Sequence, residues 1–301
     1  MNPTKVEAVE YTDCVCSTAW GAEPLLRKLD WRYGHHIAWR RVMGGLVGDA
    51  ATGKDAWDRV SAAEPMRAYW KRVWRLTDMP YPNPMHLMLQ STDPAGQAVK
   101  AAELQGQAVA DAVLRRFRER IFVDGIGPQT PDEFDAATVG VAGLDHARWR
   151  RDQARPEVAA AYQADWRETR EPNDFVRQLK HDSPMNGELK HSEGHDRYAL
   201  PTVIFRGPGG EHTVAGWVSY EEYVAGLEAA LPGATADPRP DPTPEQAFAR
   251  WGMLTAKELE MLCGPDAQPP ADAVTRDWGD GVVHYSAAEA RARGLAETAT
   301  A

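Results

Sequence analysis

A cysteine between a predicted strand and a predicted helix constrains this chain more than any other feature. The alternating residues 5–11 predict a strand, and the amphipathic residues 22–29 predict a helix. Between them, residues 13–21 read Asp-Cys-Val-Cys-Ser-Thr-Ala-Trp-Gly, so that Cys16 lies at the junction. A helix N-terminus favours an anion, and the thiolate anion is the reactive form of cysteine. The sequence therefore predicts a thiol site with Cys16 as its nucleophile.

Further segments continue the alternation of strands and helices. Residues 37–46 predict a second strand that closes on a glycine pair, and the apolar run after Pro201 predicts a third. A turn at Gly207–Gly210 joins this run to another strand at 213–217, and a helix follows at 219–231. The chain thus runs from strand, cysteine, helix and strand through a long insertion to a proline, two strands and a helix. This order of elements resembles the DsbA-like thioredoxin superfamily.

The resemblance covers roughly residues 5–232 and is to the cytoplasmic FrnE-like and SpxH-like proteins in particular. Three short sequences strengthen it. They are Trp20-Gly21 after the cysteine, the stretch Met43–Leu46, and the helical residues 98–106. The resemblance implies an α/β protein: a thioredoxin fold with a large all-helical insertion and a small C-terminal appendage of helices and a hairpin.

The sequence divides into five segments on this basis. Residues 1–54 and 186–232 are predicted to form the thioredoxin-like domain, and residues 55–185 the helical insertion. Five prolines crowd residues 232–244, so that 233–242 is predicted to be a semi-rigid linker. Residues 243–301 form the predicted appendage.

Two long helices are predicted in the insertion, at residues 58–76 and 97–122, from apolar side chains at helical spacing. The second helix closes with four arginines, which suit the negative end of a helix dipole. These are Arg115, Arg116, Arg118 and Arg120.

The appendage has the sequence outline of a winged helix. A capping box at Thr255–Glu258 predicts a helix, and Asp280-Gly281 predicts a hairpin turn. Residues 236–301 nevertheless hold six Arg and Lys against eleven Asp and Glu. Because DNA binding requires a basic surface, we interpret the appendage as a docking segment for a partner.

The reactive motif departs from the usual Cys-x-x-Cys of this superfamily. Here the register gives Cys16-Ser17-Thr18-Ala19, so the second cysteine is absent, and Cys14 precedes the site instead. Three interpretations remain open: chemistry by Cys16 alone, a Cys14–Cys16 couple, or a redox-silent site retained for binding. A Cys-x-Cys disulfide closes a small, easily reduced ring, which favours the single thiol over the couple.

The resemblance also implies roles for residues around Cys16. Pro201 would be the cis-proline that faces the thiol, and Leu200 would present its backbone to an extended substrate. The predicted site further includes residues that stabilise the thiolate or contact the substrate. These are Ser17, Thr18, Trp20, His195, Arg197 and Thr202.

Two other patterns are weaker. Gly48–Lys54 has the spacing of a phosphate loop, but Asp55 replaces the residue that would bind magnesium, so a surface loop is predicted. His191 and His195, with His181, have partial metal-ligand spacing, but Gly194 disfavours a helix there. We therefore expect no metal site.

Composition limits the function further. The formal net charge of −10 argues against nucleic-acid binding, and no apolar run of membrane-spanning length occurs. Three cysteines without an export signal predict a cytoplasmic protein rather than a disulfide-stabilised secreted one.

The sequence thus predicts a thiol-dependent oxidoreductase, reductase or transferase that uses Cys16 and needs no cofactor beyond a low-molecular-weight thiol. Its substrate would be a thiol or disulfide, small or protein-borne. The alternatives are a non-catalytic, protein-binding adaptor of the SpxH type and a FrnE-like protein of a biosynthetic pathway. Substrate identity, redox direction and oligomeric state are left open at this point.

Overall fold

The computed structural model describes residues 5–48, 57–180, 185 and 187–295. Its centre is a four-stranded sheet in the order β2-β1-β5-β6. β1 (Val6–Thr12) runs parallel to β2 (Ile37–Met43) and antiparallel to β5 (Thr202–Gly207), which pairs in turn with β6 (Gly210–Ala215). β1 is buried along nearly its whole length and β5 along its first four residues, as expected for central strands that are covered on both faces.

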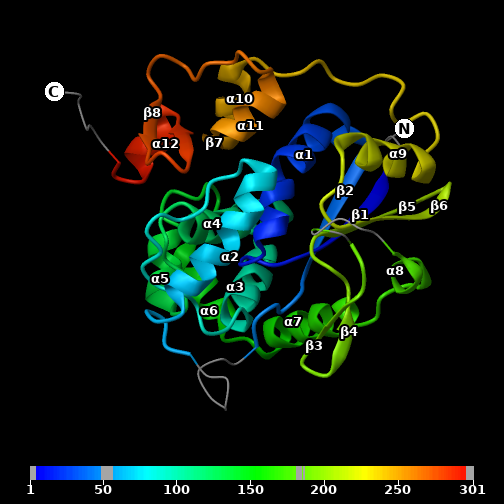
Figure 1. Ribbon diagram of the computed structural model, residues 1–301, viewed down its shortest axis with the longest axis horizontal. Coiled ribbons are helices and arrows are strands. Elements are labelled where there is room, and N and C mark those ends of the chain that lie inside the picture. The colour runs from blue at the N-terminus through cyan, green and yellow to red at the C-terminus, as the bar shows by residue number, and fades with distance from the viewer. Residues whose placement is uncertain (1–4, 49–56, 181–184, 186, 296–301) are drawn as a thin grey trace.

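Helices cover both faces of this sheet (Figure 1). Val6 and Ala8 of β1 face one side, where they pack in a cluster with Leu26 and Leu227. Alternate residues of β1 face the other side and belong to a cluster that contains Cys16 and Val176. The helices on the first side are α1 (Ser17–Tyr33) and α9 (Tyr220–Ala230), and those on the second are α7 (Pro156–Thr169) and α8 (Asp174–Gln178).

The segment between β2 and β5 is mostly helical. Besides α7 and α8 it contains α2 (Ala63–Thr77), α3 (Asp93–Glu103), α4 (Gln107–Phe122), α5 (Pro131–Ala137) and α6 (His146–Gln153). The prediction of one helix over 97–122 is wrong, because Gly106 adopts a φ of 124° and separates α3 from α4. The helix predicted at 58–76 begins later, at Ala63. A short ribbon of β3 (Lys190–Ser192) and β4 (His195–Arg197) precedes β5.

The C-terminal appendage folds as helix, strand, helix and hairpin. Its elements are α10 (Pro244–Trp251), β7 (Met253–Thr255), α11 (Ala256–Cys263), β8 (Val274–Asp277), β9 (Val282–Tyr285) and α12 (Ala287–Ala292). The three strands pair in the order β7-β9-β8. The proline-rich residues before α10 run along α1, where Trp31 donates its indole N–H to the carbonyl of Pro240 at 2.7 Å. The appendage therefore packs against the thiol-bearing helix.

Candidate thiol site

Cys16 is the N-cap residue of α1, as its place in the sequence predicts. Its backbone is extended (φ −74°, ψ 104°), and its Sγ accepts a hydrogen bond from the N–H of Ala19 at 3.4 Å. On the other side, the thiol donates to the carbonyl oxygen of Leu200 at 3.3 Å. Only 7% of the residue is exposed. The thiol is thus enclosed between the helix N-terminus and the start of β5.

The segment that faces the thiol contains three of the residues predicted for the site. The Leu200–Pro201 peptide bond is cis. The hydroxyl of Thr202 donates to the carbonyl of Ala199 at 2.7 Å, which fixes the turn before β5. A Cβ added to Gly44 would lie 2.7 Å from the Leu200 side chain, so that glycine allows Leu200 to fill the space beside the thiol. The carbonyl that would pair with an extended substrate is instead occupied by Cys16.

The electrostatics of the site oppose an activated thiolate. Burial raises the pKa of the Cys16 thiol to about 11, although the N–H of Ala19 and the Arg118 guanidinium favour the anion. Asp13 raises that pKa further, and it is itself buried, accepting hydrogen bonds from the N–H groups of Val15 and Leu46. The expectation of a lowered pKa at the helix N-terminus is therefore wrong for this closed state. Desolvation outweighs the helix dipole.

Ser17, Thr18 and Trp20 do not assist the thiol in the predicted way. Ser17 is buried, and within the described residues neither its hydroxyl nor that of Thr18 bonds to Sγ. Trp20 is only 2% exposed, donates its indole N–H to the carbonyl of Pro80, and stacks on Phe122. It belongs to the core of the helical insertion and offers no face to a substrate.

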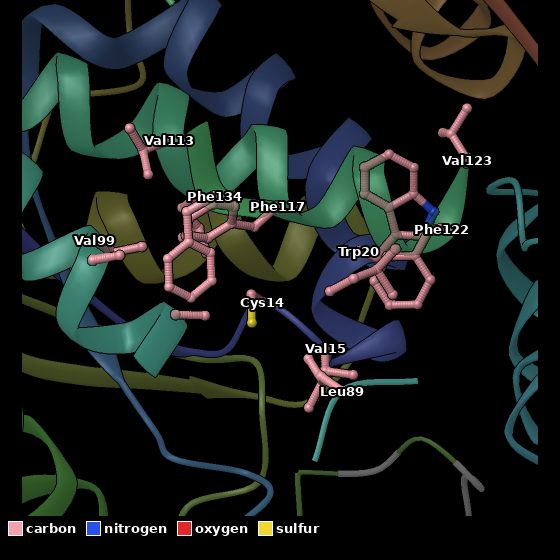
Figure 2. Close-up of a cluster of buried hydrophobic side chains, with 14 of the residues drawn as sticks. Cys14, Val15, Trp20, Leu89, Val99, Val113, Phe117, Phe122, Val123 and Phe134 are labelled. Atoms are coloured by element: carbon pink, nitrogen blue, oxygen red, sulfur yellow. The ribbon is translucent and has the colours of Figure 1, made fainter. Parts of the chain in front are cut away.

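Cys14 lies on the other side of the chain from Cys16. It is fully buried in the core that Figure 2 shows, near Phe117 and Phe134, whereas Cys16 belongs to the separate cluster beneath Leu200. Both thiols are free. Burial raises the pKa of Cys14 well above its usual value. The structure therefore gives no support to a Cys14–Cys16 couple.

The β3–β4 ribbon places Arg197 closer to the site than His195. Arg197 donates to the hydroxyl of Ser192 at 2.8 Å and to the carbonyl of Tyr198 at 2.9 Å. Burial lowers its pKa, and the negative charge that Cys16 and Asp13 can carry opposes this shift. His195 lies with its ring edge toward Trp166 and is exposed.

The remaining predictions concern ions. The exposed His191 pairs with Asp196 at 3.1 Å. In the described part of the chain, no three His, Cys, Asp or Glu residues are grouped to hold a metal. His181 and most of the phosphate-loop pattern Gly48–Lys54 lie outside the described residues. Among the described helices, none is long and apolar enough to cross a membrane.

A buried ion network behind the thiol turn escaped the sequence analysis. Arg118 bonds the hydroxyl of Thr12 and Glu23 of α1. Arg115 bonds Glu23 at 2.9 Å and binds Glu258 of α11 through two nitrogens, at 2.8 and 3.0 Å. The arginines that we assigned to the helix dipole instead join three segments of the chain. Their spacing was an available signal, because residues two apart, such as Arg116 and Arg118, lie on nearly opposite sides of a helix and cannot both face solvent on one side.

This network borders a cavity of about 1070 Å³ between α1, α4 and the appendage. Arg116 and Arg293 extend the network to Glu289 and Glu119, so α12 is held in the same way as α11. The cavity lining contains eight carboxylates and seven arginines, and several of them pair with one another. The cavity therefore separates the appendage from the sheet without presenting a large surplus of either charge.

Comparison with known proteins agrees with this architecture. A thioredoxin family profile matches residues 10–173. Proteins named ClpXP adapter protein SpxH are similar over most of the chain. That of Shouchella clausii is 26% identical, covering 85% of this chain and 77% of its own, and that of Bacillus cereus (strain ATCC 10987) is 24% identical, covering 85% and 79%.

Solved structures show the same fold at lower identity. A putative protein disulfide isomerase from Nitrosomonas europaea superimposes with a TM-score of 0.57 and 14% identity, covering 74% of this chain and 96% of its own. A probable DsbA oxidoreductase from Streptomyces coelicolor gives a TM-score of 0.51 and 18% identity, covering 75% and 89%. These two structures, which share the fold, are named as a putative disulfide isomerase and a probable oxidoreductase. The two relatives that match 85% of this chain are named as adapters.

Proposed function

The chain belongs to the thioredoxin family, within its DsbA-like superfamily, and on that premise we propose that it is a protein-binding adaptor which delivers a partner to the ClpXP protease. The observation that carries the proposal is the enclosure of the Cys16 thiol between the start of α1 and the segment before β5. Its thiol is buried, protonated and bonded to the Leu200 carbonyl, and Ala19 stands where a second cysteine would resolve a mixed disulfide. The relatives that match over most of the chain are named as ClpXP adapters.

An adaptor needs a rigid scaffold and docking surfaces rather than an exposed nucleophile. The buried arginines of α4 supply rigidity by joining the thioredoxin-like sheet, the insertion and the appendage. The appendage adds a second surface, so a partner and the protease can bind different parts of one chain. The proposed site of action is the cytoplasm.

A degradation assay tests this function. A partner is first captured from host extract with immobilised protein, identified and purified. Its half-life is then measured with purified ClpXP and ATP, with and without the chain. We expect faster degradation with wild type and with Cys16→Ser alike. The proposal fails if the chain leaves the half-life unchanged, or if capture depends on Cys16 and is reversed by dithiothreitol.

A second candidate function is thiol chemistry by Cys16 alone. It is favoured by one observation, the position of the sulfur as the N-cap of α1 directly opposite Leu200 and Pro201. Such a reaction requires that the thiol leave the Leu200 carbonyl and become hydrated. Incubation in a glutathione redox buffer followed by intact mass measurement distinguishes the two functions. A single glutathione adduct that is absent in Cys16→Ser would support the thiol function, and an unmodified mass would exclude it under those conditions.

A further inference from the structure

The sheet has a free edge along the first part of β6, near the turn to β5. Residues of the preceding segment cover the other end of this strand: the N–H of Trp217 donates to the carbonyl of Met185 at 3.1 Å, and Gly187 lies directly against Ala215. β6 is the last strand in the order β2-β1-β5-β6, and no strand of the described residues pairs with its outer side. Alternate residues of an edge strand direct their N–H and C=O groups outward. Gly207 and Gly210 are the paired residues next to the two-residue turn, so alternate residues of β6 from Gly210 onward bond to β5. The backbone groups of Glu211 and Thr213, which lie between them, therefore point outward. These backbone groups can pair with an added strand.

Two helices turn this edge into a groove. α8 packs through Val176 on one face of the sheet, and α9 packs through Tyr223 and Leu227 on the other. In Figure 1 the two helices flank the free side of β6. The resulting groove has a volume of about 690 Å³, and residues from both faces of β6 line it. The strand edge therefore forms part of its lining, between the two helices.

The groove is apolar in its lining and acidic in its charge. Phe175 of α8 is 52% exposed although it is a large aromatic residue, and Leu179 and Val218 continue the apolar surface. Three carboxylates line the same groove, from Asp174, Glu211 and Glu222, and its described lining contains no lysine or arginine. Arg206 neutralises part of this charge by pairing with Glu211 at 3.0 Å.

We propose that this groove binds an extended, basic and apolar segment of a partner protein, which adds to β6 as a fifth strand. Backbone groups of β6 would supply hydrogen bonds, and the alternate side chains of the segment would contact Phe175 and the carboxylates. The inference rests on the proposed adaptor function and names the surface that recognises the partner. It assigns no role to Cys16.

A second copy of the chain fits the same edge less well. Antiparallel pairing of two β6 strands would bring the Glu211 carboxylates of both copies to one small interface. Each copy also carries a net charge of −10, which opposes self-association. A basic segment meets neither obstacle.

Direct binding to synthetic peptides tests the inference. The probe is the labelled peptide Lys-Val-Lys-Val-Arg-Val-Lys, compared by fluorescence polarisation with the acidic peptide Glu-Val-Glu-Val-Asp-Val-Glu. A third peptide replaces the central valine of the basic probe by proline, which cannot donate to the ladder. We expect the basic probe to bind at least about tenfold more tightly than the other two, since charge and main-chain pairing both favour it.

Substitutions then locate the binding. Phe175→Ser is expected to weaken the basic probe about tenfold, as loss of an aromatic anchor does. Leu104→Ser is the matched control, because Leu104 is 41% exposed but lies at the end of α3 in the insertion. Asp174→Lys is expected to weaken binding, whereas Asp266→Lys, an exposed site in the appendage, is not. Hydrogen exchange should slow in residues 210–215 when the probe binds.

Several results would overturn the inference. They are equal binding of the basic and acidic peptides, equal losses in Phe175→Ser and Leu104→Ser, and unchanged exchange in β6. Dimerisation of the free chain that Phe175→Ser abolishes would assign the groove to a second copy instead. The degradation assay keeps the two proposals apart. If Phe175→Ser still accelerates degradation like wild type, the adaptor function stands and the groove assignment is wrong; if wild type has no effect, the adaptor function itself fails.

Discussion

The thiol turn and the appendage interface are both buried, but their polar groups are satisfied in different ways. At the thiol turn, Cys16 keeps its proton and makes two neutral contacts: it donates to the Leu200 carbonyl and accepts from the N–H of Ala19. At the appendage interface, the Arg115 guanidinium is bound by three carboxylates, from Glu23, Glu119 and Glu258. The residue that looks reactive in the sequence is neutral and enclosed, and the strongest buried charges lie where the sequence suggests only a helix end.

The comparison shows that the environment decides what each of the two sequence motifs does, the cysteine at the start of α1 and the arginines at the end of α4. A cysteine at a helix N-terminus is reactive only where water or a cation stabilises its anion. An arginine-rich helix end is ordinary only where its side chains reach solvent. In this chain burial outweighs the effect of the Arg118 guanidinium on Cys16, and Arg115, Arg116 and Arg118 are buried rather than solvent-exposed. Neither motif therefore has the property that its sequence suggests.

The largest expected effect is on the appendage interface. Glu258 has a fully buried side chain that binds both Arg115 and Arg27. We expect Glu258→Ala to lower the free energy of unfolding by about 3–5 kcal/mol, because it leaves buried guanidinium groups without their partner. Urea unfolding measures this loss. The control is Glu260→Ala on the same helix, an exposed partner of Lys257, for which we expect a change of about 1 kcal/mol or less. Equal effects of the two changes would contradict the comparison.

The next effect distinguishes the two cysteines. Cys14 is fully buried in the insertion core, with apolar side chains around its sulfur and the Asp13 carboxyl as its hydrogen-bond partner. Cys14→Ser keeps that partner but replaces the sulfur by a smaller and more polar oxygen, at a cost of about 1–3 kcal/mol. Cys16→Ser keeps a donor beside the Leu200 carbonyl and should cost about 1 kcal/mol or less. Thermal unfolding of the two variants measures the difference. A larger loss in Cys16→Ser would show that the thiol itself holds the turn together.

Acid should weaken the appendage interface before it affects the thiol. Burial acts to raise the pKa of Glu23, but Arg115, Arg118 and Arg27 outweigh it and lower that pKa well below its usual range. The stabilising contribution of Glu23 is therefore complete above its unfolded pKa of about 4.3 and is lost as the pH falls below it. We expect wild type to lose more stability than Glu23→Gln between about pH 5 and pH 3. Parallel pH profiles would show that Glu23 is not held as an anion.

The last prediction concerns the reactivity of the Cys16 thiol rather than the stability of the fold. With a pKa of about 11, its alkylation rate should rise about tenfold per pH unit from pH 7 to 10. Iodoacetamide labelling of Cys14→Ser, followed by peptide mapping, isolates this thiol from Cys14 and from Cys263. Rapid labelling that levels off below pH 7 would show that Cys16 is an accessible thiolate rather than an enclosed neutral thiol, and would favour the oxidoreductase function.

The sequence predicts the fold well because local signals and order along the chain suffice for it. Cys16 at a strand end, Pro201 before an apolar run, and the turn at Gly207–Gly210 fix the sheet and the position of α1. The break at Gly106 is harder to predict, since a glycine within an apolar helical pattern is often tolerated.

The site is predicted less completely, because its chemistry depends on contacts across long sequence separations. The sequence brings Cys16 and Pro201 to one place but does not show that burial outweighs the helix dipole. It identifies the arginines of α4 without their partners, since Glu23 precedes Arg115 by 92 residues and Glu258 follows it by 143. Only packing of the three segments converts a row of exposed charges into a buried network.

The position of Glu258 has a consequence for how this protein is made. A ribosome releases Glu23 and Arg115 first, and the carboxylate that completes the coordination of Arg115 emerges only after a further 143 residues. A nascent chain that has already formed its sheet and insertion therefore still exposes a charged, unfinished face to the cytosol. Translation that stops before α11 would leave this face permanently open, so premature termination late in the message should yield a substrate for quality control rather than a shorter folded protein.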